Sequence, residues 1–478
     1  MAEDNRKLGF GALVGIVFGM MVGSGLYNIP QNMAVEAGPL GSAIGWVVTA
    51  VGMLLLVGTL KILSDRRPDL NAGVYQYAHE GFGNYAGFNI AWGYWLCTAF
   101  ANVAYAVMLN DSFGAFFPPL LDHGWQTLVF GTVLIWSMFF IVSAGIRTAK
   151  ILNSIMAVVK VLAIVLVVVL LFLNVKAGTF SLNLSDLPDS SASLWDQVKG
   201  TMLVTLWCFI GIEGAVMVSA RARRSKDVGR ATVTGFLVAW LLYVLVSMLC
   251  FGVMSRARLM GLDDPSVAYV MREICGEWAY WFVIAAVIIS LLGGWVAWTI
   301  VCAEVPYEAA VVGIFPRSFL RLNRHGMPAY GLFVSSMAMQ IFLLLVMMAD
   351  DVYMAALQVT GMMVLPAYLA GGMFLVKISM NAQDMRQDRR SRRRRYRLVG
   401  VLCSLFCLWM IYAGGLQLFI STSIFYIAGT GFYLKARRDR AAAFRRSGSP
   451  RAKLPFTRAD RITLLLLIAG LALTLLSL

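Results

Sequence analysis

Two charged residues lie inside long apolar segments of the sequence. Glu213 stands in the segment 199–219, and Lys160 stands in the segment 151–174. A charge at the centre of a lipid bilayer costs roughly 2.5–3.5 kcal/mol on insertion scales, so a charge retained there usually has a function. Glu213 has the chemistry to pair with a cationic substrate or to exchange a proton; its structural alternative is an acid that bonds free backbone N–H groups. Lys160 either balances Glu213, occupies a cation position near the first apolar segment, or extends towards the membrane surface.

Two glycine clusters also interrupt apolar segments. The tripeptide Gly-Ser-Gly occupies 23–25 and is followed by Pro30, and the tetrapeptide Gly-Ile-Glu-Gly occupies 211–214. Glycine in a helix interior costs about 1 kcal/mol against alanine, so closely spaced glycines predict local unwinding. Unwinding frees backbone N–H groups, which suit a carboxylate, and carbonyl groups, which suit an ammonium. Because an α-amino acid carries both groups, the two breaks predict a site for a zwitterion.

The glycines before the first break have a different interpretation. Gly11, Gly15 and Gly19 recur at every fourth position, the spacing of small residues that lets helices approach closely. We therefore expect these three to serve helix packing. The cluster at 23–25 is assigned to unwinding, because Pro30 follows it and a matching cluster lies in the sixth apolar segment.

Two tryptophans stand beside glycines in the apolar segments. Trp207 precedes Glu213 by six residues, and Trp295 directly follows a pair of glycines. Indole faces attract cations, more strongly where water is excluded, so either ring could stack on a guanidinium or ammonium side chain. The alternative is a packing or interfacial role, the default in a chain with 13 tryptophans.

The segments that carry these residues predict an all-α polytopic membrane protein. Apolar residues make up 59% of the 478 residues, above the roughly 45–50% of a soluble domain. A bilayer core of ~30 Å takes about 20 apolar residues per helix, and backbone groups in lipid must be paired within their own segment. The sequence divides into thirteen such segments: 10–33, 39–62, 86–117, 125–143, 151–174, 199–219, 231–254, 278–303, 329–348, 352–377, 398–414, 416–434 and 461–477.

The charge pattern predicts the orientation. With a cytoplasmic N-terminus at 1–9, 34 of the 40 Lys and Arg residues fall in cytoplasmic segments and five fall outside, as the positive-inside rule requires. The net charge of +15 therefore reflects membrane topology rather than nucleic-acid binding. The arginine run at 392–395 is typical of a cytoplasmic stop beside a membrane helix, where it would contact anionic headgroups of the lipid bilayer. We expect a multi-pass protein of a bacterial cytoplasmic (inner) membrane.

The spacing of the two breaks predicts the domain organisation. They lie in the first and sixth segments, five helices apart, as in transporters built from two inverted five-helix repeats with a substrate site at mid-membrane. The expected parts are a transporter core at 10–377 with repeats at 10–174 and 199–377, helices 11 and 12 at 398–434, a flexible basic cytoplasmic linker at 435–460, and helix 13 at 461–477.

Other site chemistries lack the residues that they need. Seven cysteines are scattered without a CxxC motif and three histidines lie far apart, so neither a metal site, a disulfide framework nor a cofactor is expected. An enzyme embedded in the membrane would need converging catalytic groups, and the segments hold only one deep glutamate and one deep lysine. No connecting segment is long enough for a signalling domain, which argues against a sensor or scaffold.

Four parts of the sequence resemble the amino acid–polyamine–organocation transporters, within them the basic amino acid antiporters, and most of all the arginine/ornithine antiporters. The resemblance covers residues 8–435, with a thirteenth helix appended as in arginine/ornithine members. The matching parts are Val22-Gly23-Ser24-Gly25-Leu26-Tyr27 through Pro30, Thr205-Leu206-Trp207-Cys208-Phe209-Ile210-Gly211-Ile212-Glu213-Gly214, Leu292-Gly293-Gly294-Trp295, and Tyr94-Trp95-Leu96 with Asn102.

The resemblance implies where the zwitterionic end of a substrate would bind. Gly23, Ser24 and Gly25 would hold the carboxylate. Ile210 and its neighbouring carbonyl groups would take the α-ammonium.

The resemblance also implies contacts for the substrate side chain and for gating. Trp207 would cover the side chain, Trp295 would stack against it or gate it, and Asn102 would contact its distal end. Tyr94 and Glu213 would form an inner gate or a proton link.

The implied function is exchange of basic amino acids, arginine for ornithine, by alternating access. Both substrates carry one positive charge at pH 7, so one-for-one exchange would be electroneutral. Lys160 and Glu213, as residues of charge coupling, leave open a proton-coupled symporter for lysine or another cationic amino acid. A homodimer also stays open.

The sequence departs from the resembling transporters at two places. Arginine/agmatine antiporters have an asparagine three residues before the Gly-Ser-Gly, where this sequence has Met20, which argues against an agmatine exchanger. The Pro-Tyr pair common in the tenth helix is spread here as Pro366-Ala367-Tyr368.

Overall fold

The computed structural model describes residues 9–477 apart from 71–72, 186–192, 215–221, 350, 382–384, 386–388 and 447–457. The described part is built from α-helices. Their bounds are α1 Phe10–Met21, α2 Ser24–Glu36, α3 Pro39–Arg66, α4 Val74–Phe82, α5 Asn84–Gly114, α6 Trp125–Ser143, α7 Ile146–Asn174, α8 Ala177–Ser185, α9 Leu194–Trp207, α11 Ser225–Val253, α12 Arg256–Met260, α13 Ser266–Cys275, α14 Glu277–Val311, α15 Ala329–Val346, α16 Val352–Met380, α17 Arg390–Ala413, α18 Leu416–Ser421, α19 Ser423–Ala428, α20 Thr430–Arg446 and α21 Arg458–Ser477.

Length and apolar composition identify the membrane-spanning helices among the described residues. Eight helices qualify, namely α3, α5, α6, α11, α14, α15, α16 and α17, and the bent pair of α1 and α2 makes a ninth span. The all-α polytopic prediction is therefore confirmed. The predicted segment 151–174 is helical within α7, where the apolar part Val158–Asn174 is shorter than these spans. The predicted segment 199–219 runs beyond the described residues, so the count of thirteen stays a prediction.

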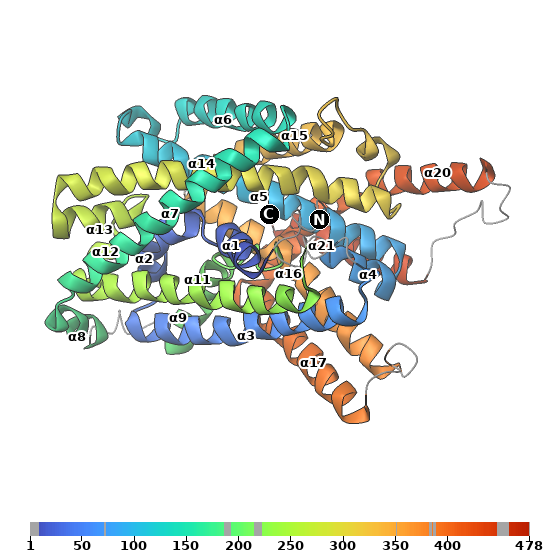
Figure 1. The fold of residues 1–478 in the computed structure, drawn as a ribbon, viewed down its shortest axis with the longest axis horizontal. Helices are drawn as coiled ribbons and strands as arrows, with labels where there is room; N and C mark the ends of the chain where they lie inside the picture. The colour runs from blue at the N-terminus through green and yellow to red at the C-terminus, as the bar shows by residue number, and fades with distance from the viewer. Residues whose placement is uncertain are drawn as a thin grey trace.

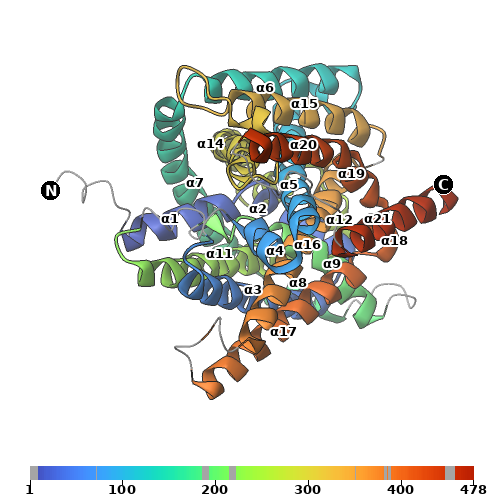
Figure 2. The same ribbon diagram turned by 90° about the vertical axis from the view of Figure 1, so that its right-hand side faces the viewer.

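Helices α3, α11 and α14 run roughly along the longest axis of the molecule, and α7 and α17 run obliquely to it (Figure 1). Helices α5 and α16 lie in the interior of the bundle (Figure 2). Helix α5 is buried along nearly its whole length and packs against α14 and α16. Short helices lie at the two ends of the axis, α8, α12 and α13 at one end and α4 at the other (Figure 1). The central position of α5 allows it to carry polar side chains into the protein without exposing them to lipid.

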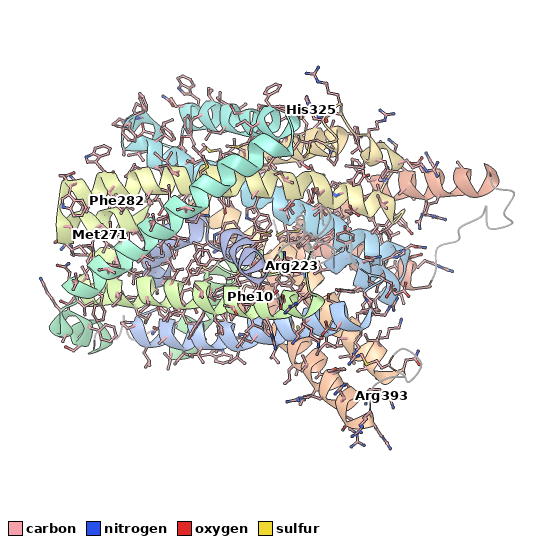
Figure 3. All side chains as sticks on the ribbon, viewed as in Figure 1. Phe10, Arg223, Met271, Phe282, His325 and Arg393 are labelled. Carbon is pink, nitrogen blue, oxygen red and sulfur yellow. The ribbon has the colours of Figure 1, made fainter. Side chains whose placement is uncertain are left out.

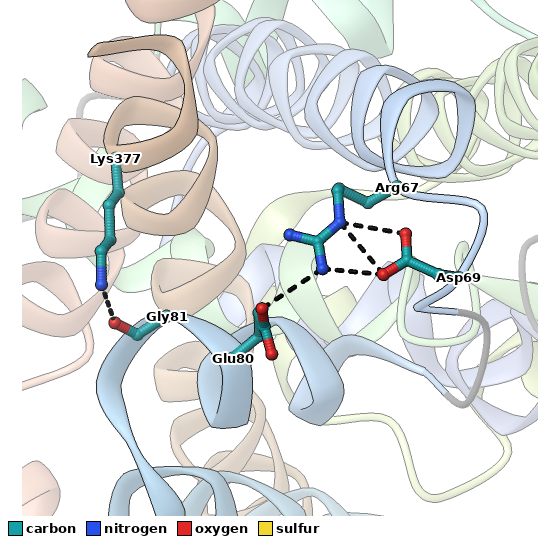
Figure 4. Close-up of polar contacts among 5 residues, drawn as sticks. All are labelled: Arg67, Asp69, Glu80, Gly81 and Lys377. Carbon is teal, nitrogen blue, oxygen red and sulfur yellow. Dashed lines mark hydrogen bonds and ion pairs between the residues drawn. The ribbon is translucent and has the colours of Figure 1, made fainter. Parts of the chain in front are cut away.

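Polar contacts join three helices at the α4 end (Figure 4). Arg67, directly after α3, contacts Asp69 at 2.7 Å and Glu80 of α4 at 3.3 Å. Lys377 of α16 donates a hydrogen bond to the Gly81 carbonyl. The Arg67 guanidinium holds the pKa of the Asp69 carboxyl below its ordinary value. These contacts close α4 against the ends of α3 and α16.

The predicted twelfth helix (416–434) is divided into α18, α19 and the start of α20, so its role as a single span stays a prediction. The Trp92 indole donates to the Phe425 carbonyl at 2.8 Å, and the Gly429 N–H instead bonds the Tyr426 carbonyl three residues back at 3.1 Å. A Cβ added at Gly429 would stand 2.7 Å from the Trp92 ring. A tertiary contact with α5 therefore interrupts an otherwise apolar helix.

The linker predicted at 435–460 is not flexible over 435–446, which is helical. Helix α20 continues to Arg446, since its arginine and alanine residues are good helix formers. Asp460, predicted within the linker, is buried at the start of α21, and its carboxylate accepts a hydrogen bond from the Tyr85 N–H at 3.1 Å. The remainder, 447–457, lies outside the described residues.

The packing role predicted for the glycine stripe of α1 stays a prediction, because no described residue packs against these glycines and 215–221, which follow Gly214, lie outside the described residues. A Cβ added at Gly11, Gly15 or Gly19 would meet no described atom within 4 Å. Helix α1 packs instead against α11, where a Cβ at Gly235 would stand 2.9 Å from Val17. The close approach therefore uses a glycine of the partner helix.

Candidate functional site

The first predicted break lies between α1 and α2. Helix α1 ends at Met21, Val22 is extended, and Gly23 adopts φ −134° and ψ −138° before α2 begins. The two helix axes differ by 48° across this break. The end of α1 and the start of α2 therefore leave carbonyl and N–H groups without helical partners at this level. The side chain of Ser24 lies outside the described residues.

The second break begins before the glycine cluster that predicted it. Helix α9 ends at Trp207, and residues 208–213 form turns, in which the N–H groups of Phe209, Ile210 and Ile212 bond carbonyls three residues back at 2.9–3.3 Å. Gly211 adopts φ +104°, a conformation that strongly favours glycine. A Cβ at Gly211 would stand 3.0 Å from both Met20 and Trp298. The glycine thus lets the unwound chain lie directly against α1 and α14.

A small cavity, with a volume of about 20 Å³, lies between the two breaks. It is bounded by both breaks together with α5 and α14. Its lining consists of Met20, Met21, Gly23, Gly25, Ala101, Tyr105, Trp207, Ile210 and Trp298. Four residues predicted to bind substrate, from segments nearly two hundred positions apart, therefore meet at one cavity.

Two aromatic side chains cover the glycines of the first break. The Tyr105 hydroxyl lies against Gly23, and the same tyrosine lies 3.0–3.1 Å from a Cβ added at Gly294. The Trp207 indole would stand 2.9 Å from a Cβ at Gly25. Any larger residue at these glycines would have to displace an aromatic ring, so the rings and the exposed backbone are fitted to each other.

Lys160 of α7 reaches the first break from behind the cavity. The side chain is buried, and its Nζ donates a hydrogen bond to the Val22 carbonyl at 2.5 Å. The Tyr243 hydroxyl donates to the neighbouring Met21 carbonyl at 3.1 Å. These two donors satisfy carbonyl groups that the end of α1 leaves free. Lys160 thus lies in the position expected for a cation near the first helix.

Glu213 is buried behind the second break and is bonded by two tyrosines. The Tyr94 hydroxyl of α5 donates to one carboxylate oxygen, and the Tyr368 hydroxyl of α16 donates to the other at 3.0 Å. Glu213 is 2% exposed and is absent from the cavity lining. The carboxylate therefore ties the unwound segment to α5 and α16 and does not face the cavity.

Comparison with known proteins assigns the chain. The family model described as amino acid permease matches residues 8–433. The chain belongs to the amino acid permease family. It is 38% identical over 475 residues to a Clostridium perfringens protein named only as an amino-acid transporter, covering 98% of this chain and 97% of that one. It is 40% identical to an arginine/agmatine antiporter of Chlamydia abortus (91% of each chain) and 41% identical to one of Chlamydia trachomatis (89% of each chain).

Asn102 of this permease lies near the cavity but does not line it. Its amide nitrogen donates to the Thr98 carbonyl at 2.9 Å and to the Cys302 sulfur at 3.2 Å. Its amide oxygen is buried and has no hydrogen-bond partner among the described residues. Ala101 and Tyr105 present the cavity-facing side of α5 instead.

Trp295 also lies away from the cavity. Its ring is fully buried, and in the described part of the chain its indole N–H has no hydrogen-bond partner. Trp298, one helical turn further along α14, lines the cavity in its place.

Three residues of the permease site were not predicted from sequence: Tyr105, Trp298 and Tyr368. Trp298 follows Trp295 by three residues in the same segment. How α14 is rotated about its axis, and therefore which of the two rings faces the cavity, could not be predicted from the sequence. Tyr368 was signalled by the altered Pro-Tyr pair of the tenth helix. Tyr105 had no comparable signal.

Proposed function

We propose that this permease exchanges cationic amino acids across a bacterial cytoplasmic membrane, arginine for ornithine, by alternating access. The observation that carries the proposal is the meeting of two unwound helices and two indole rings at one cavity. Relatives named arginine/agmatine antiporter support both the exchange and the cationic substrate class.

The two ends of the substrate would use different parts of the cavity. N–H groups at the start of α2, beside Gly23 and Gly25, would bind the carboxylate, because a helix N-terminus favours an anion. Carbonyl groups of the unwound segment around Ile210 would bind the α-ammonium. Trp207 and Trp298 would contact the cationic side chain through their ring faces. Tyr105, which lies against Gly23, would have to move when the carboxylate arrives.

Charged groups behind the cavity would couple the breaks to the surrounding helices. We assign Lys160 to holding the end of α1 through Val22, and Glu213 to holding the second break through Tyr94 and Tyr368. At this position the positive charge is supplied by the Lys160 side chain of the protein itself. Neither role requires proton transfer in each cycle, which favours exchange over proton-coupled symport.

The fold would serve alternating access as two inverted repeats at 10–174 and 199–377, each beginning with a broken helix. Rocking of the broken helices against the rest would open the cavity to one side and then the other. The positive-inside bias of the sequence supports a cytoplasmic side for the N-terminus and for the α4 end of the molecule.

A second candidate pair, arginine for agmatine, is favoured by the names of the relatives. Agmatine lacks the carboxylate and carries two positive charges, so this exchange would move net charge. Met20 occupies the position of the asparagine in such antiporters and packs against Gly211, where it offers a thioether in place of an amide. The two pairs therefore differ in a measurable way, because only arginine/agmatine exchange responds to membrane potential.

Counterflow in proteoliposomes tests the proposal. Vesicles loaded with ornithine, agmatine, lysine or buffer receive labelled arginine outside, with and without an imposed potential. The proposal expects uptake into ornithine-loaded vesicles and not into empty ones, with no response to potential. Uptake only into agmatine-loaded vesicles would replace ornithine as the partner. Uptake into empty vesicles under a pH gradient would establish the proton-coupled symporter.

A further inference from the structure

A polar pocket lies where α16 ends and α17 begins, far from the central cavity. Its volume is about 170 Å³. Its lining consists of Ser379 and Met380 of α16 and of Arg390, Arg393, Arg394 and Arg397 of α17. The four arginines recur at intervals of three, one and three residues, a spacing that places them on one face of a helix. The arginine run therefore has a concave side that faces α16.

The pocket exists because the two helices diverge from a close crossing. Gly372 of α16 and Gly400 of α17 pack so tightly that a Cβ on either would stand 2.9–3.2 Å from the carbonyl oxygen of the other. Ser379 and Arg393 each lie seven residues from this crossing, or roughly 10 Å along a helix. The Arg66 guanidinium of α3 donates to the Tyr396 hydroxyl at 3.2 Å and fixes the basic end of α17 beside the protein. The opening between the helices is therefore held in place from both sides.

The guanidinium groups of the pocket lack counterions in the described part of the chain. None of the four lining arginines forms a hydrogen bond or ion pair there through its side chain, and the Arg393 Nε is buried without an acceptor. Like charges held this closely repel one another, so the arrangement is stabilised by an anion between them. Guanidinium groups match the geometry of a phosphate with paired N–H donors.

The surroundings of the pocket point to a lipid as the source of the phosphate. Both helices that form it span the membrane. Leu398, Leu402 and Leu405 follow the arginines along α17 and are 39–57% exposed. A headgroup in the pocket would therefore place its acyl chains along an apolar helix surface. Figure 3 shows Arg393 on the part of α17 that extends from the body of the protein, where a headgroup can reach it.

We propose that this pocket binds the phosphate group of an anionic phospholipid at the cytoplasmic membrane surface. The bound lipid offsets part of the positive charge of the four arginines and fixes α17 against the end of α16. The site is independent of the exchange proposed for the central cavity.

Native mass spectrometry of the purified full-length protein tests the proposal, with phosphatidylglycerol and phosphatidylcholine added in turn. The pocket variant is Arg393→Gln with Arg397→Gln. The matched control is Arg392→Gln with Arg395→Gln, which removes the same charge from positions outside the pocket lining. We expect the pocket variant to retain about 10-fold less phosphatidylglycerol than the wild type, and the control to change less than about 2-fold. Phosphatidylcholine binding should be equal in all three proteins.

Two results would overturn the proposal. Equal loss of phosphatidylglycerol in both variants would mean that overall charge, rather than the pocket, attracts the lipid. Displacement of phosphatidylglycerol by millimolar inorganic phosphate, with phosphate retained by the wild type and lost from the pocket variant, would make this a site for free phosphate. Both variants are checked for monodispersity and for unchanged helical circular dichroism.

Discussion

The two helix breaks border the same cavity but are anchored to the surrounding helices in opposite ways. At the first break, side-chain donors come to the backbone, since Lys160 and Tyr243 donate to the carbonyls of Val22 and Met21. At the second break, the side chain of the broken segment itself is held, since Glu213 accepts from Tyr94 and Tyr368. One break is anchored by an incoming cation, and the other by its own anion.

This difference indicates how the cavity can be polar without containing a charged side chain. Lys160 and Glu213 lie behind the two breaks, and the cavity surface is formed by glycines, aromatic rings, alanine, isoleucine and methionine. Recognition of a zwitterion would then depend on backbone dipoles, while the buried charges hold those dipoles in position. The predictions below separate the anchoring groups from the groups that contact substrate.

The largest effect is expected at the anchor of the first break. Lys160→Met would leave the buried Val22 carbonyl without a donor, at a cost of about 1–3 kcal/mol, and we expect arginine exchange in proteoliposomes to fall more than about 10-fold. Detergent-purified protein must stay monodisperse for the comparison to hold. Exchange within 2-fold of the wild type would mean that the first break does not need its cation.

A substrate-contacting ring is expected to act on affinity rather than on anchoring. Trp207→Ala removes an indole from the cavity, and the loss of a desolvated cation–π contact would raise the KM for arginine by about 10–30-fold. The matched control is Trp295→Phe, which removes an indole that is fully buried and absent from the cavity lining. The interpretation fails if Trp295→Phe raises KM as much as Trp207→Ala does.

The anchor of the second break has two donors, so removing one should have a moderate effect. Tyr368→Phe deletes one hydrogen bond to Glu213, worth about 1 kcal/mol, and we expect exchange to slow about 5-fold at an unchanged KM. Glu213→Gln, which alters both contacts, should slow exchange further. A raised KM with an unchanged maximal rate would instead place Tyr368 in substrate binding.

The smallest effect is expected at His123, outside the membrane-spanning helices and distant from both breaks. Its ring Nε2–H donates a hydrogen bond to the Asp111 carboxylate at 2.8 Å, which raises the pKa of His123 above its ordinary value. The contact therefore stabilises the folded protein below that ordinary value, and the stabilisation is lost as pH rises through the raised pKa. His123→Ala should lower the Tm by about 1–2 °C at pH 5.5 and leave it unchanged at pH 9. An equal decrease at both values would assign the effect to packing.

Both breaks were predictable because their signals are local. Closely spaced glycines and Pro30 destabilise a helix wherever it lies, so the fold class and the two unwound segments followed from the sequence. The breadth of the second break did not, since residues 208–213 unwind in a contact between Gly211, Met20 and Trp298 that only the packed structure contains.

The differences between the sequence-based expectations and the structure arise from helix rotation or from contacts between distant segments. Trp295 and Trp298 differ by three residues, which is 60° short of a full turn on a helix with 3.6 residues per turn, and this rotation decides which ring lines the cavity. The stretch 416–434 is apolar enough for a span, yet Trp92 of α5 interrupts it at Gly429. Neither outcome is encoded by the composition of the segment concerned.

The central claim, that the cavity between the breaks binds a cationic amino acid, is tested most directly by substrate protection. Ala101 lines the cavity, so Ala101→Cys in a Cys275→Ser background presents a thiol there, and its rate of modification by a small methanethiosulfonate reagent is measured against the same background without it. The account predicts that arginine and ornithine slow this modification in a saturable manner and that glutamate does not. Modification that is unaffected by arginine, in a variant that still exchanges arginine, would contradict the assignment of the site.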